Sequence, residues 1–157
     1  MRYRIHPAMR FRPEPTTEAW LHSIDDDDLG EAWMALDDDS KADLEQEFFQ
    51  KLLTFFADRF TCMFRADLPF DEDRAAILST IGTRKSTVVE QGTVLSGVLV
   101  PSVGIALPNA SHLVTLEVCC NGDAVLTVHD GWTGAWIDID EPLLAEIRTV
   151  VQDHFVS

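Results

Sequence analysis

The sequence contains few basic residues, and one long stretch has none, which argues against a class of sites. Only 12 of the 157 residues are lysine or arginine, and none of them lies between Lys85 and Arg148. Enzymes that bind phosphorylated or carboxylated substrates commonly hold the anion with these side chains. A glycine-rich phosphate loop is also missing, because the segment GTVLSG at 92–97 lacks the Lys-Ser/Thr ending. A nucleotide-dependent enzyme is therefore not expected.

Cysteines and long apolar runs are scarce as well. The three cysteines, Cys62, Cys119 and Cys120, are an odd number with an adjacent pair. Such a set is a poor disulfide framework and favours a structural role in a reducing compartment. No apolar run approaches the roughly 18 residues of a membrane span, and no apolar segment of a signal peptide is visible at the amino end. We therefore expect a cytoplasmic protein with no membrane partner.

The length and composition predict one globular domain. A chain of 157 residues falls within the range of a single domain with its own core. Apolar residues make up 46% and charged residues 25%, which are ordinary values for a globular protein. No internal repeat or long linker divides the chain, so we treat residues 1–157 as a single domain.

The first half of the chain is predicted to be mainly helical after a short basic arm. Residues 1–13 contain four arginines and no acid, and they alternate as in a half-buried strand. Helical patterns follow within 16–82, with a short helix at about 28–36, a long one at about 40–62 and another at 71–81. The apolar face of the long helix is so wide that we expect it to be buried against a sheet or in a dimer.

The second half changes to a strand-like period. Residues 86–139 contain short β-rich runs separated by Gly, Pro and Asn turns, which predicts an antiparallel meander of about four to six strands. Residues 140–155 are predicted to form a closing helix, with Asp140 as its cap and Pro142 in its first turn. The expected fold class is α+β, with a helical N-terminal part packed on the meander and closed by the C-terminal helix.

One hairpin is predicted in detail, around Asn121 and Gly122. The Asn-Gly pair favours a two-residue turn of type I′. The separation of apolar from polar faces instead favours pairing Val118 with Leu126, which needs one residue more in the loop. A bulge beside the turn would satisfy both requirements.

Acidic residues are concentrated near the amino end. Residues 14–47 contain thirteen acids and one lysine, and the whole chain has a net charge of −15. This exceeds the magnitude of about 2–8 that keeps a small domain soluble. An aspartate at a helix start stabilises the helix by about 0.3–2 kcal/mol, which explains Asp28 and one of the three at 37–39. The other acids have no such role, so a recognition surface is the sharper interpretation.

Geometry relates this segment to nucleic acid. If residues 25–39 were helical they would span about 22 Å, over which one DNA strand presents roughly six or seven phosphates, against eight acids here. We therefore expect a non-enzymatic binding protein that inhibits or neutralises a basic, nucleic-acid-handling partner, as immunity proteins or DNA-mimicking phage inhibitors do. Tight binding would also need aromatic anchors such as Trp33 or Trp132. The expected partner-binding residues are Asp25, Asp26, Asp27, Asp28, Glu31, Trp33, Asp37, Asp38 and Asp39.

Other uses of the charges stay open at this point. The acids can form a solvated face with no partner at all. Cation binding is disfavoured, because an EF-hand loop aligned on Gly30 would have Leu36 where its bidentate glutamate must stand. The basic arm at 1–13 is expected to pair with the protein's own acids, within the chain or across a dimer, and not with nucleic acid.

Two other functions are alternatives. An acidic chaperone-like escort of a secreted protein would use the long Phe-rich helix as its dimer or client face. A small hydrolase would use His129 with Asp130 or Asp138, although a solvent-facing histidine at a strand end is the simpler interpretation. The histidines and cysteines show no HxH, HExxH or CxxC spacing, so no metal or cofactor is expected.

Overall fold

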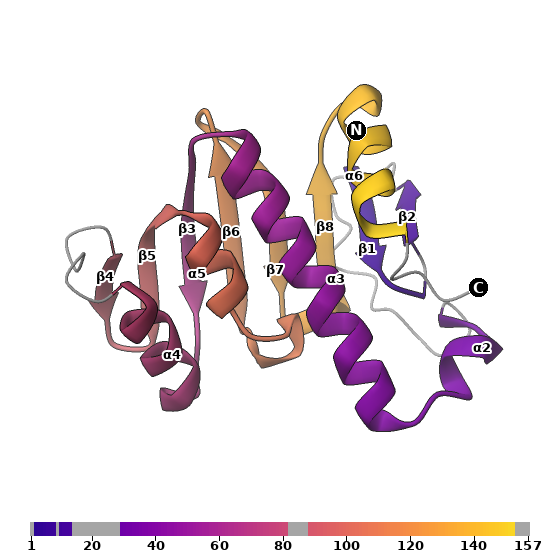
Figure 1. The fold of residues 1–157 in the computed structure, drawn as a ribbon, viewed down its shortest axis with the longest axis horizontal. Helices are drawn as coiled ribbons and strands as arrows, with labels where there is room; N and C mark the ends of the chain where they lie inside the picture. Colours follow the sequence, from indigo (N-terminus) through magenta and orange to yellow (C-terminus); the bar gives the residue numbers. More distant parts are fainter. Residues whose placement is uncertain (1, 9, 14–28, 82–87, 153–157) are drawn as a thin grey trace.

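An eight-stranded antiparallel sheet is the centre of the fold, and its helices lie on one side (Figure 1). The computed structural model describes residues 2–8, 10–13, 29–81 and 88–152. The strands are β1 (Arg2–His6), β2 (Arg10–Pro13), β3 (Cys62–Asp67), β4 (Val88–Gln91), β5 (Val94–Leu99), β6 (Thr115–Cys120), β7 (Asp123–His129) and β8 (Gly134–Asp138). The helices are α2 (Glu31–Met34), α3 (Asp38–Arg59), α4 (Asp71–Ile81), α5 (Pro101–Ala106) and α6 (Glu141–Val151), with 3₁₀ turns η3 (Ala110–His112) and η4 (Gly131–Thr133).

The α+β class is confirmed, but the sheet is larger than predicted. The strand order is β2-β1-β8-β7-β6-β3-β5-β4, and every neighbouring pair is antiparallel. The predicted meander accounts for β4 to β8. The count of four to six strands was too low because β1, β2 and β3, from the first half of the chain, join the same sheet.

Strand β3 corrects the predicted end of the long helix. Helix α3 ends at Arg59, and the chain becomes extended at Cys62 instead of continuing as a helix. Burial alternates along β3, with Phe64 and Ala66 buried and Met63 and Arg65 exposed between them. This period of two was hidden because an apolar helix with no glycine or proline at its end precedes it.

Helix α3 packs its apolar face on the sheet, as its sequence predicted. Figure 1 shows it running diagonally across the sheet between α5 and α6. Its core side chains are fully buried, among them Phe48, Phe49 and Phe56. Gly104 of α5 permits close contact, since a Cβ there would lie 3.3 Å from the Cβ of Leu53. The wide apolar face is thus covered within one chain.

The hairpin between β6 and β7 has the predicted two-residue turn with a bulge beside it. Asn121 and Gly122 both have positive φ, 54° and 88°, in a two-residue turn. A register shift between Val118 and Cys119 then pairs Val118 with Leu126. The bulge satisfies both the turn and the apolar face, and the prediction is confirmed.

The cysteines differ from the expectation. Cys62 of β3 and Cys120 of β6 are direct neighbours in the register, with Cα atoms 4.3 Å apart, and they form a disulfide. Cys119 is the free cysteine. The sequence spacing is uninformative here because the bridge joins residues 58 positions apart that only the sheet brings together.

The remaining helices follow their local signals. Helix α4 spans the predicted residues, and α6 begins after Asp140, whose side chain accepts a hydrogen bond from the backbone N–H of Leu143 at 3.0 Å. Helix α2 is shorter than predicted, with four residues from Glu31. Within the described ranges, no helix combines the length and the apolar character that crossing a membrane requires.

Candidate functional site

The two aspartate runs have different outcomes. The first, comprising Asp25, Asp26, Asp27 and Asp28, lies outside the described residues. The second begins α3, where the Asp37 side chain caps the helix by accepting a hydrogen bond from the backbone N–H of Ser40 at 2.7 Å. This bond, together with a second one from the Ser40 side chain, lowers the pKa of Asp37. Asp37 is therefore used in the helix cap.

Three other predicted residues are exposed at helix starts. Asp38 and Asp39 lie in the first turn of α3, and Glu31 lies in the first turn of α2. Backbone N–H groups at a helix start favour nearby negative charge, which is consistent with acidic residues at these positions. These three side chains are placed where a partner could contact them.

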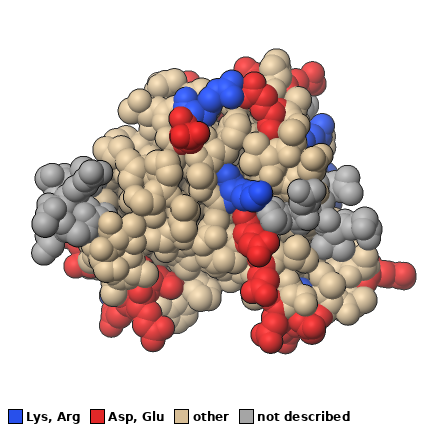
Figure 2. All heavy atoms as spheres, viewed as in Figure 1, with Lys and Arg blue, Asp and Glu red and all other residues tan. Residues whose placement is uncertain are grey.

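Helix α4 adds acids that the prediction did not include. Its first turn contains Asp71, Glu72 and Asp73, and it begins at the same lower edge of the molecule as α3 (Figure 1). Figure 2 shows acidic atoms gathered along that lower edge on this face. We call the following residues the acidic edge: Asp38, Asp39, Asp43, Asp71, Glu72 and Asp73.

His112 of η3 connects the two halves of the acidic edge. Its Nδ1 lies 3.1 Å from Oδ2 of Asp73. The same histidine lines a hollow of about 430 Å³ together with Asp38 and Asp43 at the start of α3. Lys41 also lines this hollow, and Arg74 forms an ion pair with Asp71, so a part of the negative charge is balanced locally.

The exposed apolar side chains near this edge differ from those predicted. Trp33 is only 4% exposed and Trp132 only 8%, so neither offers a partner the aromatic anchor expected from the sequence. Phe70 is instead 55% exposed, immediately before α4, with its ring centroid 5.4 Å from that of His112. Met34 on α2 is 44% exposed.

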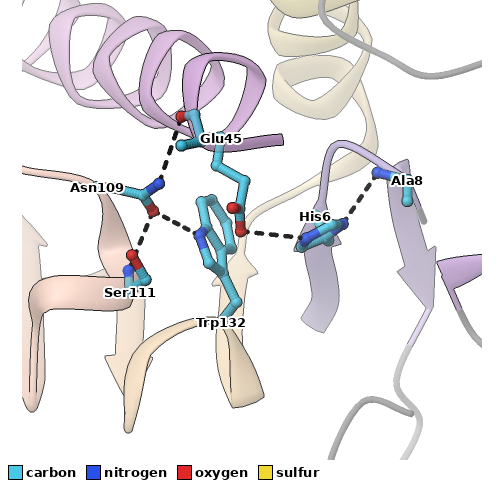
Figure 3. Close-up of polar contacts among 7 residues, drawn as sticks. His6, Ala8, Glu45, Asn109, Ser111 and Trp132 are labelled. Atoms are coloured by element: carbon cyan, nitrogen blue, oxygen red, sulfur yellow. Dashed lines mark hydrogen bonds and ion pairs between the residues drawn. The ribbon is translucent and has the colours of Figure 1, made fainter. Parts of the chain in front are cut away.

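Trp33 is buried because it packs on a histidine. The ring of His6, at the end of β1, lies between Trp33 and Trp132, with centroids 4.6 Å and 5.3 Å away. His6 Nδ1 accepts a hydrogen bond from the backbone N–H of Ala8 at 3.0 Å, so the neutral ring has its proton on Nε2 (Figure 3). That nitrogen lies 3.5 Å from Oε2 of Glu45 on α3. The cluster therefore connects β1, α2 and α3.

Asn109 extends this cluster to the acidic edge. Its side-chain oxygen accepts hydrogen bonds from Trp132 Nε1 at 2.7 Å and from the backbone N–H of Ser111 at 3.1 Å (Figure 3). Its amide nitrogen donates to the backbone oxygen of Ala42 at 3.4 Å. Asn109 is 6% exposed, so these bonds replace water that it cannot reach. They hold η3, with His112, against the first turns of α3.

One of the two pairs considered for a hydrolase, His129 with Asp138, is not brought together. His129 is exposed at the end of β7, opposite Gly134 of β8. Asp138 lies four residues further along β8, which is about 13 Å, and its carboxylate is 4.0 Å from Arg2. Asp130 precedes η4 with positive φ and makes no side-chain cap. In the described part of the chain, no group of three His, Cys, Asp or Glu side chains could hold a metal ion.

Sequence reasoning missed Phe70 and the acids of α4 as site residues. The signal was present as "LPFDED", which predicted a helix start but not its position beside the start of α3. The chain matches no protein-family model, no curated protein and no solved structure. The functional argument therefore rests on the geometry of the described residues.

Proposed function

We propose that the protein is a non-enzymatic acidic binding protein that inhibits or neutralises a basic, nucleic-acid-handling partner, as immunity proteins and DNA-mimicking phage inhibitors do. The observation that carries this proposal is the acidic edge, where two helices from distant parts of the chain begin along the same edge of the molecule and expose two groups of carboxylates (Figure 2). A single partner surface can contact both. Its lysines and arginines would then be occluded from the phosphates that they otherwise bind.

The electrostatics favour fast association with such a partner. Exposed charges act over a Debye length of about 8–10 Å near physiological salt, so the acids within each of the two helix starts reinforce one another. A field of opposite sign to the partner's can raise association rates towards about 10⁸–10⁹ M⁻¹s⁻¹ at low salt. The association rate should therefore be the quantity most sensitive to added salt.

Phe70 is the apolar anchor in this proposal. Tight protein complexes depend on a few well-packed side chains, often aromatic, surrounded by polar contacts. Phe70 is the aromatic residue that lies exposed between the start of α4 and His112, whereas Trp33 and Trp132 support the fold. We expect Phe70→Ala to speed dissociation, because it removes contact area without changing the charge.

The alternatives receive less support from the same contacts. An escort with α3 as its client face would need exposed phenylalanines, but Phe48, Phe49 and Phe56 are fully buried on the sheet. A hydrolase using His129 with Asp138 would need the two side chains within reach of one substrate atom, and the register separates them.

The test compares two variants that lose the same charge. The edge variant has Asp38→Asn, Asp39→Asn and Glu72→Gln. The control variant removes three exposed acids at the opposite end of the sheet, with Asp58→Asn, Asp123→Asn and Glu141→Gln. The probe is the set of basic proteins that a heparin column retains from a cell extract, applied to each immobilised protein at low salt.

The proposal expects that proteins captured by the wild type are also captured by the control variant and are lost from the edge variant. Raising the salt concentration should release them. Equal capture by the edge and control variants would show that binding depends on total charge and would overturn the proposed site.

A further inference from the structure

The side of the sheet that faces away from the helices has a different composition from the acidic edge. Figure 1 shows α3, α4, α5 and α6 on one side of the sheet. Side chains alternate along each strand, so every second residue of the central strands points to the other side. We call the following residues of β5, β3, β6 and β7 the open side: Val94, Ser96, Val98, Met63, Arg65, Asp67, Thr115, Glu117, Cys119, Thr127 and His129.

The open side is nearly neutral in a strongly acidic protein. The chain has 27 acids and 12 lysines and arginines, yet the open side contains one arginine and two acids. Asp67 lies at its lower end and accepts a hydrogen bond from the Thr93 hydroxyl at 2.7 Å. At the centre, Arg65 of β3 stands directly opposite Glu117 of β6, and both are exposed.

Apolar residues border this charged pair. Met63 is 51% exposed, and its direct neighbours in the register are Val98 on β5 and Cys119 on β6. The row lies two residues along the strands from Arg65 and Glu117. Beside the charged pair is a hollow of about 530 Å³, and its lining includes Arg65, Glu117 and Trp136. Covering the apolar row would gain about 25 cal/mol for each Å² removed from water.

We propose that a second copy of this chain binds the open side, so that the protein forms a reversible symmetric dimer through this surface. In a two-fold dimer each protomer presents the same patch. A patch that contains Arg65 beside Glu117 is complementary to itself. In the dimer, Arg65 of each protomer can face Glu117 of the other, which gives two equivalent ion pairs. The acidic surfaces of two copies repel each other, so approach through a nearly neutral patch has the smallest electrostatic cost.

The size of the patch indicates a weak dimer. Four strands about 4.8 Å apart and six residues long cover about 19 Å by 20 Å, or about 400 Å² on each protomer. A standard stable interface buries about 800 Å² on each partner. We therefore expect a dimer that dissociates on dilution and is not a permanent assembly.

The proposed dimer does not depend on the proposed function. Their opposite responses to salt distinguish the two. Two copies that each carry a net charge of −15 repel each other, and added salt screens that repulsion. Dimerisation should strengthen as salt rises from low to physiological concentration. Binding of a basic partner at the acidic edge should weaken over the same range, so either result can fail alone.

The experiment is sedimentation equilibrium from micromolar to millimolar protein at physiological salt. Arg65→Glu places glutamates against glutamates twice in the dimer and should raise its dissociation constant at least about tenfold. Glu117→Arg should do the same with arginines. The double variant Arg65→Glu with Glu117→Arg restores opposite charges and should return the constant to within about threefold of the wild type.

Lys51→Glu is the matched control, because it makes the same charge change on an exposed position of α3. It should leave dimerisation close to that of the wild type, and thermal melting should confirm that all four variants are folded. A wild type that stays monomeric at millimolar concentration would overturn the proposal. So would single variants that dimerise like the control, or a double variant that dimerises no better than the single ones.

Discussion

The acidic edge, at the starts of α3 and α4, consists of acidic side chains. The open side of the sheet instead carries one arginine, two acids and several apolar residues. The local backbone explains the difference. The first turn of a helix has free N–H groups that stabilise carboxylates, so α3 and α4 can each begin with a run of acids. Neighbouring strands would place like charges about 5 Å apart, which is destabilising. The two surfaces are therefore suited to different partners.

The largest expected effect on stability comes from removing the Cys62–Cys120 disulfide. The Cys62–Cys120 disulfide joins β3 to β6 and closes a loop of 58 residues. Replacing both cysteines by serine should lower the free energy of unfolding by up to about 4 kcal/mol, because the unfolded chain regains the freedom of that loop. Urea denaturation measures the loss.

Cys119→Ser is the control, since it leaves the bridge intact and should change the stability little. Equal stability of the double variant and the wild type would show that the two sulfur atoms are not joined in solution. The sequence predicted a cytoplasmic protein, and a reducing compartment would keep Cys62 and Cys120 as thiols, so the disulfide of the structure and that expectation exclude each other. Counting the free thiols of protein taken directly from cells distinguishes the bridged state from the reduced one.

A change at Asn109 should affect the acidic edge and spare the open side. Asn109→Ala leaves the buried Nε1 hydrogen of Trp132 without its acceptor, at a cost of about 1–3 kcal/mol. It also releases η3 from Ala42, so capture of basic proteins should fall while dimerisation is unchanged. Ser111→Ala is the matched control. Asn109 accepts a hydrogen bond from the backbone N–H of Ser111, which this substitution keeps. Equal effects of the two variants would contradict the role of Asn109.

The cap of α3 should contribute a smaller, pH-dependent amount. Asp37→Ala should lower the free energy of unfolding, because it removes the side chain that caps the first turn of α3. The pKa of Asp37 is lowered in the folded state by the hydrogen bonds of Ser40. The contribution is therefore fully present above the pKa that Asp37 has in the unfolded chain, and it is lost as the pH falls through the lower pKa of the folded state.

Denaturation curves of the wild type and variants at several pH values measure this effect. Asp37→Asn should keep most of the cap without the acid-dependent loss, and Asp38→Ala should have little effect because Asp38 does not cap the helix. A constant difference between wild type and Asp37→Ala down to the lowest pH at which both fold would contradict the assignment.

The smallest expected effect is chemical and concerns the thiol of the open side. Burial raises the pKa of Cys119, and a hydrogen bond to Glu117 raises it further. The thiol should therefore react with iodoacetamide more slowly at neutral pH than a cysteine in an unfolded peptide. Glu117→Gln should lower that pKa and speed the reaction, which a pH series of alkylation rates would show. An unchanged rate would mean that the carboxylate does not influence the thiol.

Local patterns were sufficient for much of the fold. The turn at Asn121 with its bulge, the cap at Asp140 and the extent of α4 each depend on residues close in sequence, and each is confirmed. Strand β3 and the bridge at Cys62 were not predicted. The period of two in residues 62–67 was hidden by the apolar helix before it, and the bridge depends on which distant strand lies beside Cys62, which no local rule contains.

The sequence predicted only in part which of the candidate side chains are exposed. Asp38 and Asp39 are exposed as expected, because a helix start defines where its first residues point. Trp33 was wrongly expected to face a partner, since its burial depends on contact with His6 from a strand far away in the sequence. The contribution of α4 to the same edge was missed for the same reason, because it is a property of the tertiary structure.

The first strand of the chain has one neighbour in the sheet that arrives only near the end. Strand β1 pairs with β8, which is completed at Asp138. During synthesis on the ribosome, the β1–β2 hairpin can therefore pair with β8 only after the residues up to Asp138 have been synthesised. A nascent chain that ends before β8 would leave the hairpin unpaired and would expose the edge of β7 that β8 normally covers. Such fragments should therefore be early targets for chaperones.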